Sequence, residues 1–331
     1  MSMVHYSTKE WLEKNSKFFL PPVCNKMMHN DQLKVFFVGG PNQRKDFHLE
    51  EGEELFYMRK GSMELPILEQ GQIRTVKINE GDIFLLPGRI PHSPQRGKDT
   101  VGLVIERERL ETETDGLRYF VEGSTDILYE RWFHCEDLGT QLKPIIDEFF
   151  ASDEHKTGQP SENSVITSAP WEPNSQRSVP PPFNLQDWLD MNRRLIRSSG
   201  ELFLFDPKQF QSDVKVLGFG EGQRELLNTT EVFLWQLEGS AVVSLNGQEI
   251  RLRRDELAAL EEFAWFSARD QTEEFSDRKL IKQQLTKLKG SVKVNKHFWR
   301  NLLRNPGHKI LNPELVQEQL KTKLELLGTL I

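Results

Sequence analysis

Residues 48–61 read HLEEGEELFYMRKG, and residues 81–92 read GDIFLLPGRIPH. Each stretch carries a short β-rich segment, Leu55–Met58 in the first and Ile83–Leu86 in the second, with glycine or proline close to its ends. No helix-length periodicity interrupts the similar segments around them, which are Leu33–Val38, Glu64–Leu68, Thr75–Ile78 and Val101–Glu106. This spacing predicts an all-β protein built on an antiparallel barrel.

Three side chains in these stretches have the chemistry of metal ligands. His48 and Glu54 lie six residues apart, and His92 follows the second β-rich segment. Two neutral imidazoles and one carboxylate can bind one face of a metal ion and leave open positions, an arrangement typical of non-haem Fe(II) oxygenases. Inward-facing residues of different strands converge in a barrel, so the three can meet. A single histidine beside a proline is more often a hydrogen-bonded structural residue, and the prediction therefore depends on the surrounding residues.

The glycines and prolines around these side chains resemble the two motifs of the cupin superfamily. The framework consists of Gly40, Gly61, Gly81 and Pro87. Gly40 lies two residues further from the first histidine than the motif asks, and Glu50 stands where the motif has its second histidine. We therefore expect three protein ligands instead of four, with Glu50 outside the ligand set.

The second half of the chain repeats part of this pattern. Residues 54–62, ELFYMRKGS, align with residues 232–240, VFLWQLEGS. This alignment puts Leu226 opposite His48 and Val232 opposite Glu54. A second overlay, of Arg254 on Gly81, puts Trp265 opposite His92, so all three ligand positions become apolar. We expect a bicupin of two antiparallel jelly-roll β-barrels with a few peripheral helices, in which the second barrel holds no metal.

Changes in composition suggest the domain boundaries. The chain is rich in Pro, Ser and Asn between residues 161 and 183, helical patterns occupy residues 8–19, 141–152 and 185–196, and Asn246-Gly247 predicts a hairpin. We expect a catalytic cupin domain over residues 1–161, a linker over 162–179 and a degenerate, metal-free cupin domain over 180–276. Residues 277–331 are expected to form a basic helical extension of unknown role.

Charge and cysteine content exclude several classes of protein. Residues 277–331 carry 12 Lys and Arg against 4 Asp and Glu, a net charge of +8, which leaves −15 for residues 1–276. An acidic body argues against a nucleic-acid partner. Cys24 and Cys135 alone make neither a disulfide framework nor a thiolate metal site. No run approaches the ~18 apolar residues of a membrane span, and no export signal begins the chain, so we expect a cytosolic monomer without a membrane partner.

Two arginines and a glutamate are candidates for contact with a substrate. Arg44 precedes His48 by four residues, and Arg96 follows His92 by four. Guanidinium groups bind carboxylates in a planar, bidentate manner, which favours an anionic substrate, although the alternative of ordinary surface arginines stays open. Glu106 has the strand parity of an inward-facing residue, and an exposed strand end is the alternative.

Several motifs together resemble the animal, two-cupin family of 3-hydroxyanthranilate 3,4-dioxygenases, over roughly residues 5–275. These motifs are PPVCNK at 21–26, GGPN at 39–42, RKD at 44–46, EEGEE at 50–54, PHSPQR at 91–96, ETE at 111–113 and DGLRY at 115–119. The resemblance implies one Fe(II) per chain, bound by His48, Glu54 and His92. It also implies that Arg44, Arg96 and Glu106 contact the substrate or the bound oxygen. With two isolated cysteines, we expect no second, rubredoxin-like iron.

The resemblance also implies a reaction. Members of this family cleave the ring of 3-hydroxyanthranilate with O2 to 2-amino-3-carboxymuconate semialdehyde, which cyclises to quinolinate for NAD synthesis. Two alternatives stay open at this point. One is a different cupin enzyme with the same three ligands, and the other is a metal-free binding or storage protein built on two cupins. The basic extension departs from the family pattern.

Overall fold

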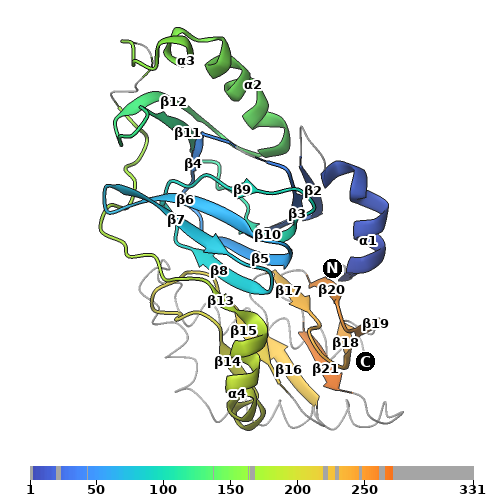
Figure 1. Cartoon of the computed structure of the whole chain (residues 1–331). Coiled ribbons are helices and arrows are strands. Elements are labelled where there is room, and N and C mark those ends of the chain that lie inside the picture. Colours follow the sequence, from blue (N-terminus) through green and yellow to red (C-terminus); the bar gives the residue numbers. More distant parts are fainter. Residues whose placement is uncertain are drawn as a thin grey trace, which may run out of the picture. The chain divides into compact units, whose positions relative to one another are not determined.

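The computed structural model describes residues 3–19, 24–42, 44–136, 138–162, 164, 168–218, 223–227, 231–245, 248–260 and 265–270 (Figure 1). Strands predominate among these residues, and the paired strands are antiparallel. The prediction of an all-β protein is confirmed. No helix in this described part of the chain is both long and apolar enough to span a membrane.

The first barrel has two sheets with a hydrophobic core between them. One sheet has the order β13-β8-β5-β10-β3-β2 and consists of β2 (Asn25–Asn30), β3 (Leu33–Gly39), β5 (Glu54–Lys60), β8 (Asp82–Leu86), β10 (Val101–Arg107) and β13 (Phe183–Asn184). The opposite strands form the orders β12-β11-β4 and β7-β6-β9, and they are β4 (Phe47–Leu49), β6 (Met63–Glu69), β7 (Gln72–Ile78), β9 (Gln95–Arg96), β11 (Asp115–Phe120) and β12 (Ile127–Phe133).

Alternation of apolar residues explains how the core forms. Phe56 and Met58 of β5, Phe84 and Leu86 of β8, and Leu65 of β6 point into one buried cluster. These residues recur at every second position, which places them on one face of each strand. The outer face of the first sheet is also apolar, and it packs against α4 (Leu185–Ser199).

A second set of strands follows in the chain. It comprises the order β16-β21-β18-β19 and the order β1-β20-β17, with β1 (Met3–Ser7), β16 (Gln223–Leu227), β17 (Val232–Trp235), β18 (Ser240–Leu245), β19 (Gln248–Arg253), β20 (Glu256–Leu260) and β21 (Trp265–Asp270). β14 (Glu201–Phe203) and β15 (Lys215–Leu217) form a separate pair. Gly61 and Gly239, which the repeat alignment superposes, both have positive φ, at 69° and 63°.

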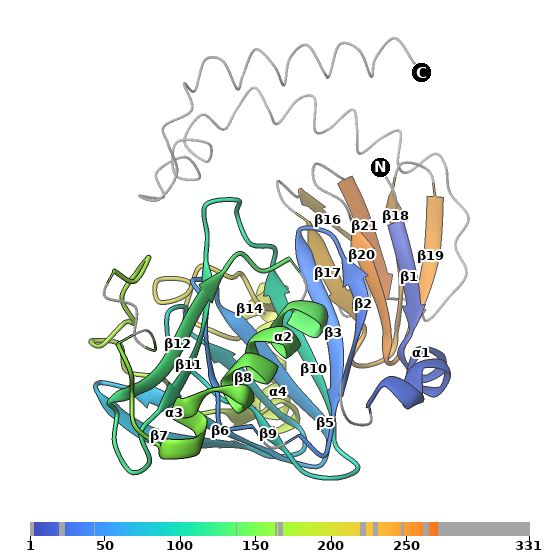
Figure 2. The same cartoon turned by 90° about the horizontal axis from the view of Figure 1, so that it is seen from above.

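Two strands, β1 and β13, pair with a strand set distant from them in the sequence. β1 pairs with β20, and Figure 2 shows it in blue among the orange strands of the second set. In the other direction β13 pairs with β8 of the first barrel. The sequence order of the strands therefore differs from their spatial grouping, and the predicted domain boundaries stay a prediction.

The predicted helices and hairpin are present. The N-terminal helix is α1 (Thr8–Asn15), continued by the 3₁₀ turn η1 (Ser16–Phe19), and later helices are α2 (Leu138–Ala151) and α3 (Asp153–Thr157). β18 and β19 pair at Leu245 and Gln248, which confirms the hairpin, although Asn246 and Gly247 themselves lie outside the described residues. The expected extension over 277–331 also lies outside the described residues.

The segment predicted as a linker packs against the first barrel. Trp171 is buried against Phe47 and Leu49, and its indole Nε1 donates to the Thr114 carbonyl oxygen at 2.8 Å. Val179 belongs to the barrel core itself. Prolines and serines around these two residues hid their apolar contribution from any periodicity in the sequence.

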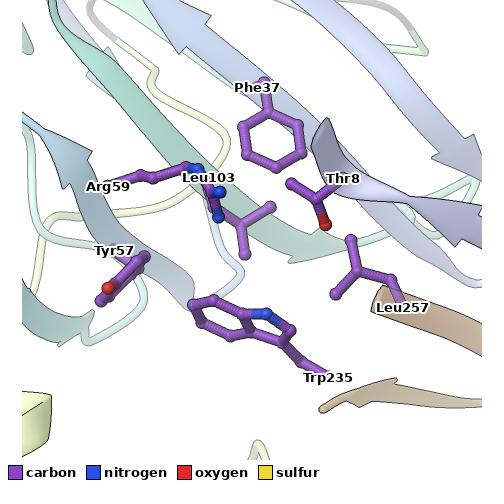
Figure 3. Close-up of a pocket in the computed structure, with 7 residues that line it drawn as sticks. All are labelled: Thr8, Phe37, Tyr57, Arg59, Leu103, Trp235 and Leu257. Carbon is purple, nitrogen blue, oxygen red and sulfur yellow. The ribbon is translucent and has the colours of Figure 1, made fainter. Parts of the chain in front are cut away.

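An apolar seam joins the first barrel to the second set of strands. Figure 3 shows Trp235 of β17 directed toward Tyr57 of β5 and Leu103 of β10. The rings of Tyr57 and Trp235 lie edge to face with centroids 4.8 Å apart. Such burial of large aromatic rings stabilises the contact between the two strand sets.

A buried polar contact crosses the same junction and gives a first prediction. Glu231 accepts from the ring of His29 and from the Leu33 backbone N–H, the latter at 2.5 Å. Glu231→Ala leaves both buried groups without their acceptor, so we expect a loss of about 3 kcal/mol in the free energy of unfolding. Urea unfolding measures it. Glu238→Ala, which breaks an exposed ion pair with Arg193, is the control and should cost less than about 1 kcal/mol. Equal losses in the two variants would contradict the prediction.

Candidate metal centre and substrate site

The fold brings His48 and His92 together through backbone pairing. His48 lies in β4, and its N–H donates to the His92 carbonyl oxygen at 2.8 Å while the His92 N–H donates back at 3.0 Å. The two imidazole centroids are 5.3 Å apart and both residues are buried. Pro91 and Pro94 flank the second histidine and favour the extended backbone that this bridge needs.

Glu54 and Glu106 lie opposite each other on the neighbouring strands β5 and β10. The register of β5 and β10 pairs Glu54 directly with Glu106, and both side chains are buried. This places Glu106 inside, as its strand parity predicts, and excludes the exposed alternative. Nε2 of His92 lies 2.9 Å from Oε2 of Glu54, but the contact lacks hydrogen-bond geometry and leaves that oxygen without a donor.

Glu50 also enters the site, which the sequence did not predict. Ligand atoms of His48, Glu50 and His92 lie within 4.8 Å of one another, and so do those of Glu50, Glu54 and Glu106. His48 and Glu54 do not fall within one such group; both lie close to His92 and Glu50. The expectation that Glu50 is not a ligand stays a prediction. Its place in the motif, where cupins have a second histidine, was the signal for its approach.

Two further residues complete the buried cluster. Asp115, at the start of β11, lies 2.7 Å from Nε2 of His48 through its Oδ2. Arg109 binds Glu50, Glu106 and Asp115 with one guanidinium group. Sequence reasoning missed Arg109 because the run Glu106-Arg107-Glu108-Arg109 has the alternating charge of a solvated strand end.

The charges of this cluster fit a bound cation. Buried oxygens of Glu50, Glu54 and Glu106 each lack a hydrogen-bond partner within the described part of the chain. Burial raises the pKa of Glu50 well above its ordinary value, and raises that of Glu106 to about 7 although Arg109 opposes the change. Burial also acts to raise the pKa of Glu54, but the neighbouring histidines outweigh it and the pKa falls. A divalent cation would satisfy the three free oxygens, so the residues present fit a metal ion.

Hydrogen bonding and burial also suit His48 and His92 to bind a metal ion. Nδ1 of His92 donates to the Ile90 carbonyl oxygen at 3.0 Å, which leaves the Nε2 lone pair of the neutral ring toward Glu54. Burial lowers the pKa of His48, against the opposing effect of Asp115. For His92, burial favours the neutral ring, but Glu54 outweighs it and the pKa is raised. The structure thus offers mixed nitrogen and oxygen donors at a dry site.

The raised pKa of Glu106 predicts how stability of the metal-free protein depends on pH. A carboxyl group whose folded-state pKa rises from 4.5 to about 7 destabilises the fold as pH increases through that window. Glu106→Gln is therefore expected to raise the free energy of unfolding of the metal-free protein by on the order of 2 kcal/mol at pH 8. Below pH ~4.5, where the carboxyl is protonated in both states, the substitution should have no such effect. Urea unfolding at both pH values measures this. The exposed Glu108→Gln should change neither, and a Glu106→Gln protein that is less stable at pH 8 would refute the prediction.

The two predicted arginines, Arg44 and Arg96, lie close to each other but differ in their ion-pair and hydrogen-bond partners. Arg96 of β9 is buried, and in the described residues its guanidinium makes one hydrogen bond, from Nε to the Gly39 carbonyl oxygen at 2.7 Å, and no ion pair. Burial, followed by the nearby charge of Arg44, lowers the pKa of Arg96 to about 10. Arg44 instead donates from Nε to Asp46 at 2.9 Å and pairs with it through Nη2. Within the described residues, Arg96 is therefore a buried cation without an anionic partner.

A separate polar cleft of about 460 Å³ lies outside this cluster. Its lining includes Glu51 and Glu53, which alternate with Glu50 and Glu54 along the same segment. Arg107 and Glu113 form an ion pair on its wall. None of the site residues named above lines this cleft.

Comparisons with known proteins identify the family of this chain. The family described as 3-hydroxyanthranilic acid dioxygenase matches residues 1–150. A 3-hydroxyanthranilate 3,4-dioxygenase from Bos taurus is 53% identical over 248 residues, covering 75% of this chain and 86% of that protein. The Homo sapiens protein of the same name is 49% identical over 261 residues, covering 78% and 90%. One from Nematostella vectensis is 50% identical over 238 residues, covering 72% and 84%.

Solved structures with similar folds are more distant. A salicylate 1,2-dioxygenase from Pseudoaminobacter salicylatoxidans has a TM-score of 0.44 at 13% identity, covering 81% of this chain and 78% of that one. A cupin 2 conserved barrel domain protein from Leptotrichia buccalis has a TM-score of 0.42 at 10% identity, covering 82% and 91%. Likenesses at this level carry no argument about chemistry.

The sequence relatives are decisive because their similarity is high and covers most of each relative. All the candidate site residues, from Arg44 to Asp115, fall inside the stretch that matches the family. The chain belongs to the family of 3-hydroxyanthranilate 3,4-dioxygenases.

Proposed function

We propose that this chain is an Fe(II)-dependent extradiol dioxygenase. It would convert 3-hydroxyanthranilate and O2 to 2-amino-3-carboxymuconate semialdehyde, the precursor of quinolinate in NAD synthesis. The observation that carries the proposal is a buried cluster in which His92 lies close to His48 and 2.9 Å from Glu54, with carboxylate oxygens that have no partner in the described residues. Its place in a family whose relatives carry this name supports the choice of substrate.

One iron per chain would be held by His48, Glu54 and His92 in the first barrel. Bound Fe(II) supplies open positions where substrate and dioxygen meet, and a path for electrons between them. Apolar core residues beside the site, such as Phe56, exclude water; its ring centroid lies 6.5 Å from that of His92. In so dry a site, charge on the substrate interacts strongly with the protein.

Three side chains of the chain would handle the substrate. Arg96 would bind the substrate carboxylate and thereby fix which ring bond faces the oxygen, since its guanidinium has no carboxylate partner among the described residues. Arg44, held by Asp46, would add positive charge beside that carboxylate. Glu106 would accept the proton of the substrate hydroxyl at its free Oε2, which suits a carboxylate whose pKa is about 7.

Anaerobic reconstitution with Fe(II) tests the proposal. After addition of 3-hydroxyanthranilate and air, the ultraviolet-visible spectrum should show the semialdehyde while one O2 is consumed per substrate. If the protein binds iron but does not turn over 3-hydroxyanthranilate, its activity is that of a different cupin enzyme. If the protein binds no iron, it is instead a metal-free binding or storage protein built on two cupins.

We extend the proposal to location and assembly. The enzyme would act as a cytosolic monomer on a small molecule, without nucleic-acid or membrane partners. The acidic body of residues 1–276 supports the absence of such partners for this part of the chain, because nucleic acid and anionic lipid both require a basic surface. Cell fractionation and sedimentation equilibrium test it.

A further inference from the structure

Arg109 is the cation around which the buried acids of the site are arranged. Its Nη2 lies 2.5 Å from Oε2 of Glu50 and 3.1 Å from Oδ2 of Asp115, its Nε donates to Oδ1 of Asp115 at 3.3 Å, and its Nη1 donates to Oε1 of Glu106. The side chain is only 8% exposed. These partners come from the loop after β4, the end of β10 and the start of β11. One guanidinium therefore joins three separate segments of the barrel.

Two of these partners, Glu106 and Asp115, connect Arg109 to the proposed proton acceptor and to the candidate metal ligand His48. Arg109 occupies one oxygen of Glu106, and the other, Oε2, has no partner in the described residues. Oδ2 of Asp115 contacts both Nη2 of Arg109 and Nε2 of His48. A continuous path of polar contacts thus runs from Glu106 through Arg109 and Asp115 to His48. The planar fork of arginine makes these contacts in fixed directions, which a lysine ammonium group does not reproduce.

We infer that Arg109 is a positioning residue that orients Glu106 and, through Asp115, the ring of His48. A single guanidinium then sets both the group that accepts the substrate proton and one of the metal ligands. The part of this inference that concerns turnover rests on the proposed function. The part that concerns the His48 ring does not, because it follows from contacts within the protein.

The first test is a double-mutant cycle with Arg109→Lys and Glu106→Gln on the iron-loaded full chain. Arg109→Lys alone should lower kcat/KM by about tenfold or more, because small displacements of reacting groups are costly. In the Glu106→Gln background the same change should cause a clearly smaller loss, because only the part that acts through Asp115 and His48 then remains. Arg107→Lys is the matched control. Arg107 lies two residues away and is ion-paired with Glu113, so its kinetics should equal those of the wild type.

The second test reads the His48 ring without turnover. The full chain is labelled with ¹⁵N-histidine, Zn(II) is added in place of iron, and the His48 N–H signal is assigned by its loss in His48→Gln. Exchange of this proton with water should be at least about tenfold faster in Arg109→Lys than in Arg107→Lys, because Asp115 loses its anchor. Thermal unfolding of each variant shows that the fold is retained.

The outcomes separate the two ideas. Unchanged kinetics in Arg109→Lys, or an equal loss in both Glu106 backgrounds, would overturn the role toward Glu106. Unchanged His48 exchange would overturn the role through Asp115. If the wild-type chain does not act on 3-hydroxyanthranilate, the proposed function fails, and the exchange measurement still decides whether Arg109 positions the histidine.

Discussion

His48→Ala is expected to abolish iron retention and to lower turnover by at least about a thousandfold, because the metal stabilises several kcal/mol of developing charge. The ring of His48 is buried, paired through the backbone with His92 and held by Asp115. Alanine removes one nitrogen donor and leaves an excess of buried carboxylates that cannot hold the ion in the same geometry. Iron per chain after desalting and oxygen uptake with substrate are the two measurements.

The control for this experiment is His155→Ala. His155 lies on α3, is exposed and packs against Phe149 and Phe150, away from the candidate ligands. This variant should keep both its iron and its turnover. If His48→Ala retained one iron per chain, His48 would leave the ligand set, and the neighbouring Glu50 would become the first candidate to replace it.

Much of the first barrel was predictable because its signals are local. Strand alternation and the glycines at turns act within a few residues, and the barrel brings His48 and Glu54 together with the more distant His92. Strand parity favoured an inward Glu106 but left an exposed strand end open, and the register of β5 and β10 then placed it inside, opposite Glu54. Each of these inferences needs only the period of a strand and the convergence of inward side chains.

The parts that escaped prediction depend on long-range contacts. Arg109 follows the end of β10, where strand parity no longer applies, and one of its three partners, Glu50, lies 59 residues away. The pairing of β1 with β20 joins residues 249 to 257 positions apart. No local pattern encodes such contacts, since both ends must be known at once.

Arg96→Met is expected to raise KM for 3-hydroxyanthranilate by about 10- to 100-fold while iron is retained. The guanidinium is buried, and within the described residues it has the Gly39 carbonyl oxygen as its hydrogen-bond acceptor and no carboxylate. A charge-assisted contact to the substrate carboxylate contributes about 1.5–3 kcal/mol, which sets the size of the effect. Methionine fills a similar volume without the charge. Steady-state kinetics and iron content of the purified variant measure the result.

Arg44→Met is the matched comparison, and it should show the opposite balance of effects. Arg44 is already neutralised by Asp46, so its loss should raise KM less than the loss of Arg96. It would, however, leave the carboxylate of Asp46, only 3% exposed, without its cation, and thermal stability should fall by about 3 kcal/mol. Arg96→Met removes a buried charge that has no ion-pair partner in the described residues, so the protein should be at least as stable as the wild type. Equal KM values for the two variants would remove Arg96 from its role as the carboxylate anchor. A loss of stability in Arg96→Met would show that its charge serves the fold instead of the substrate.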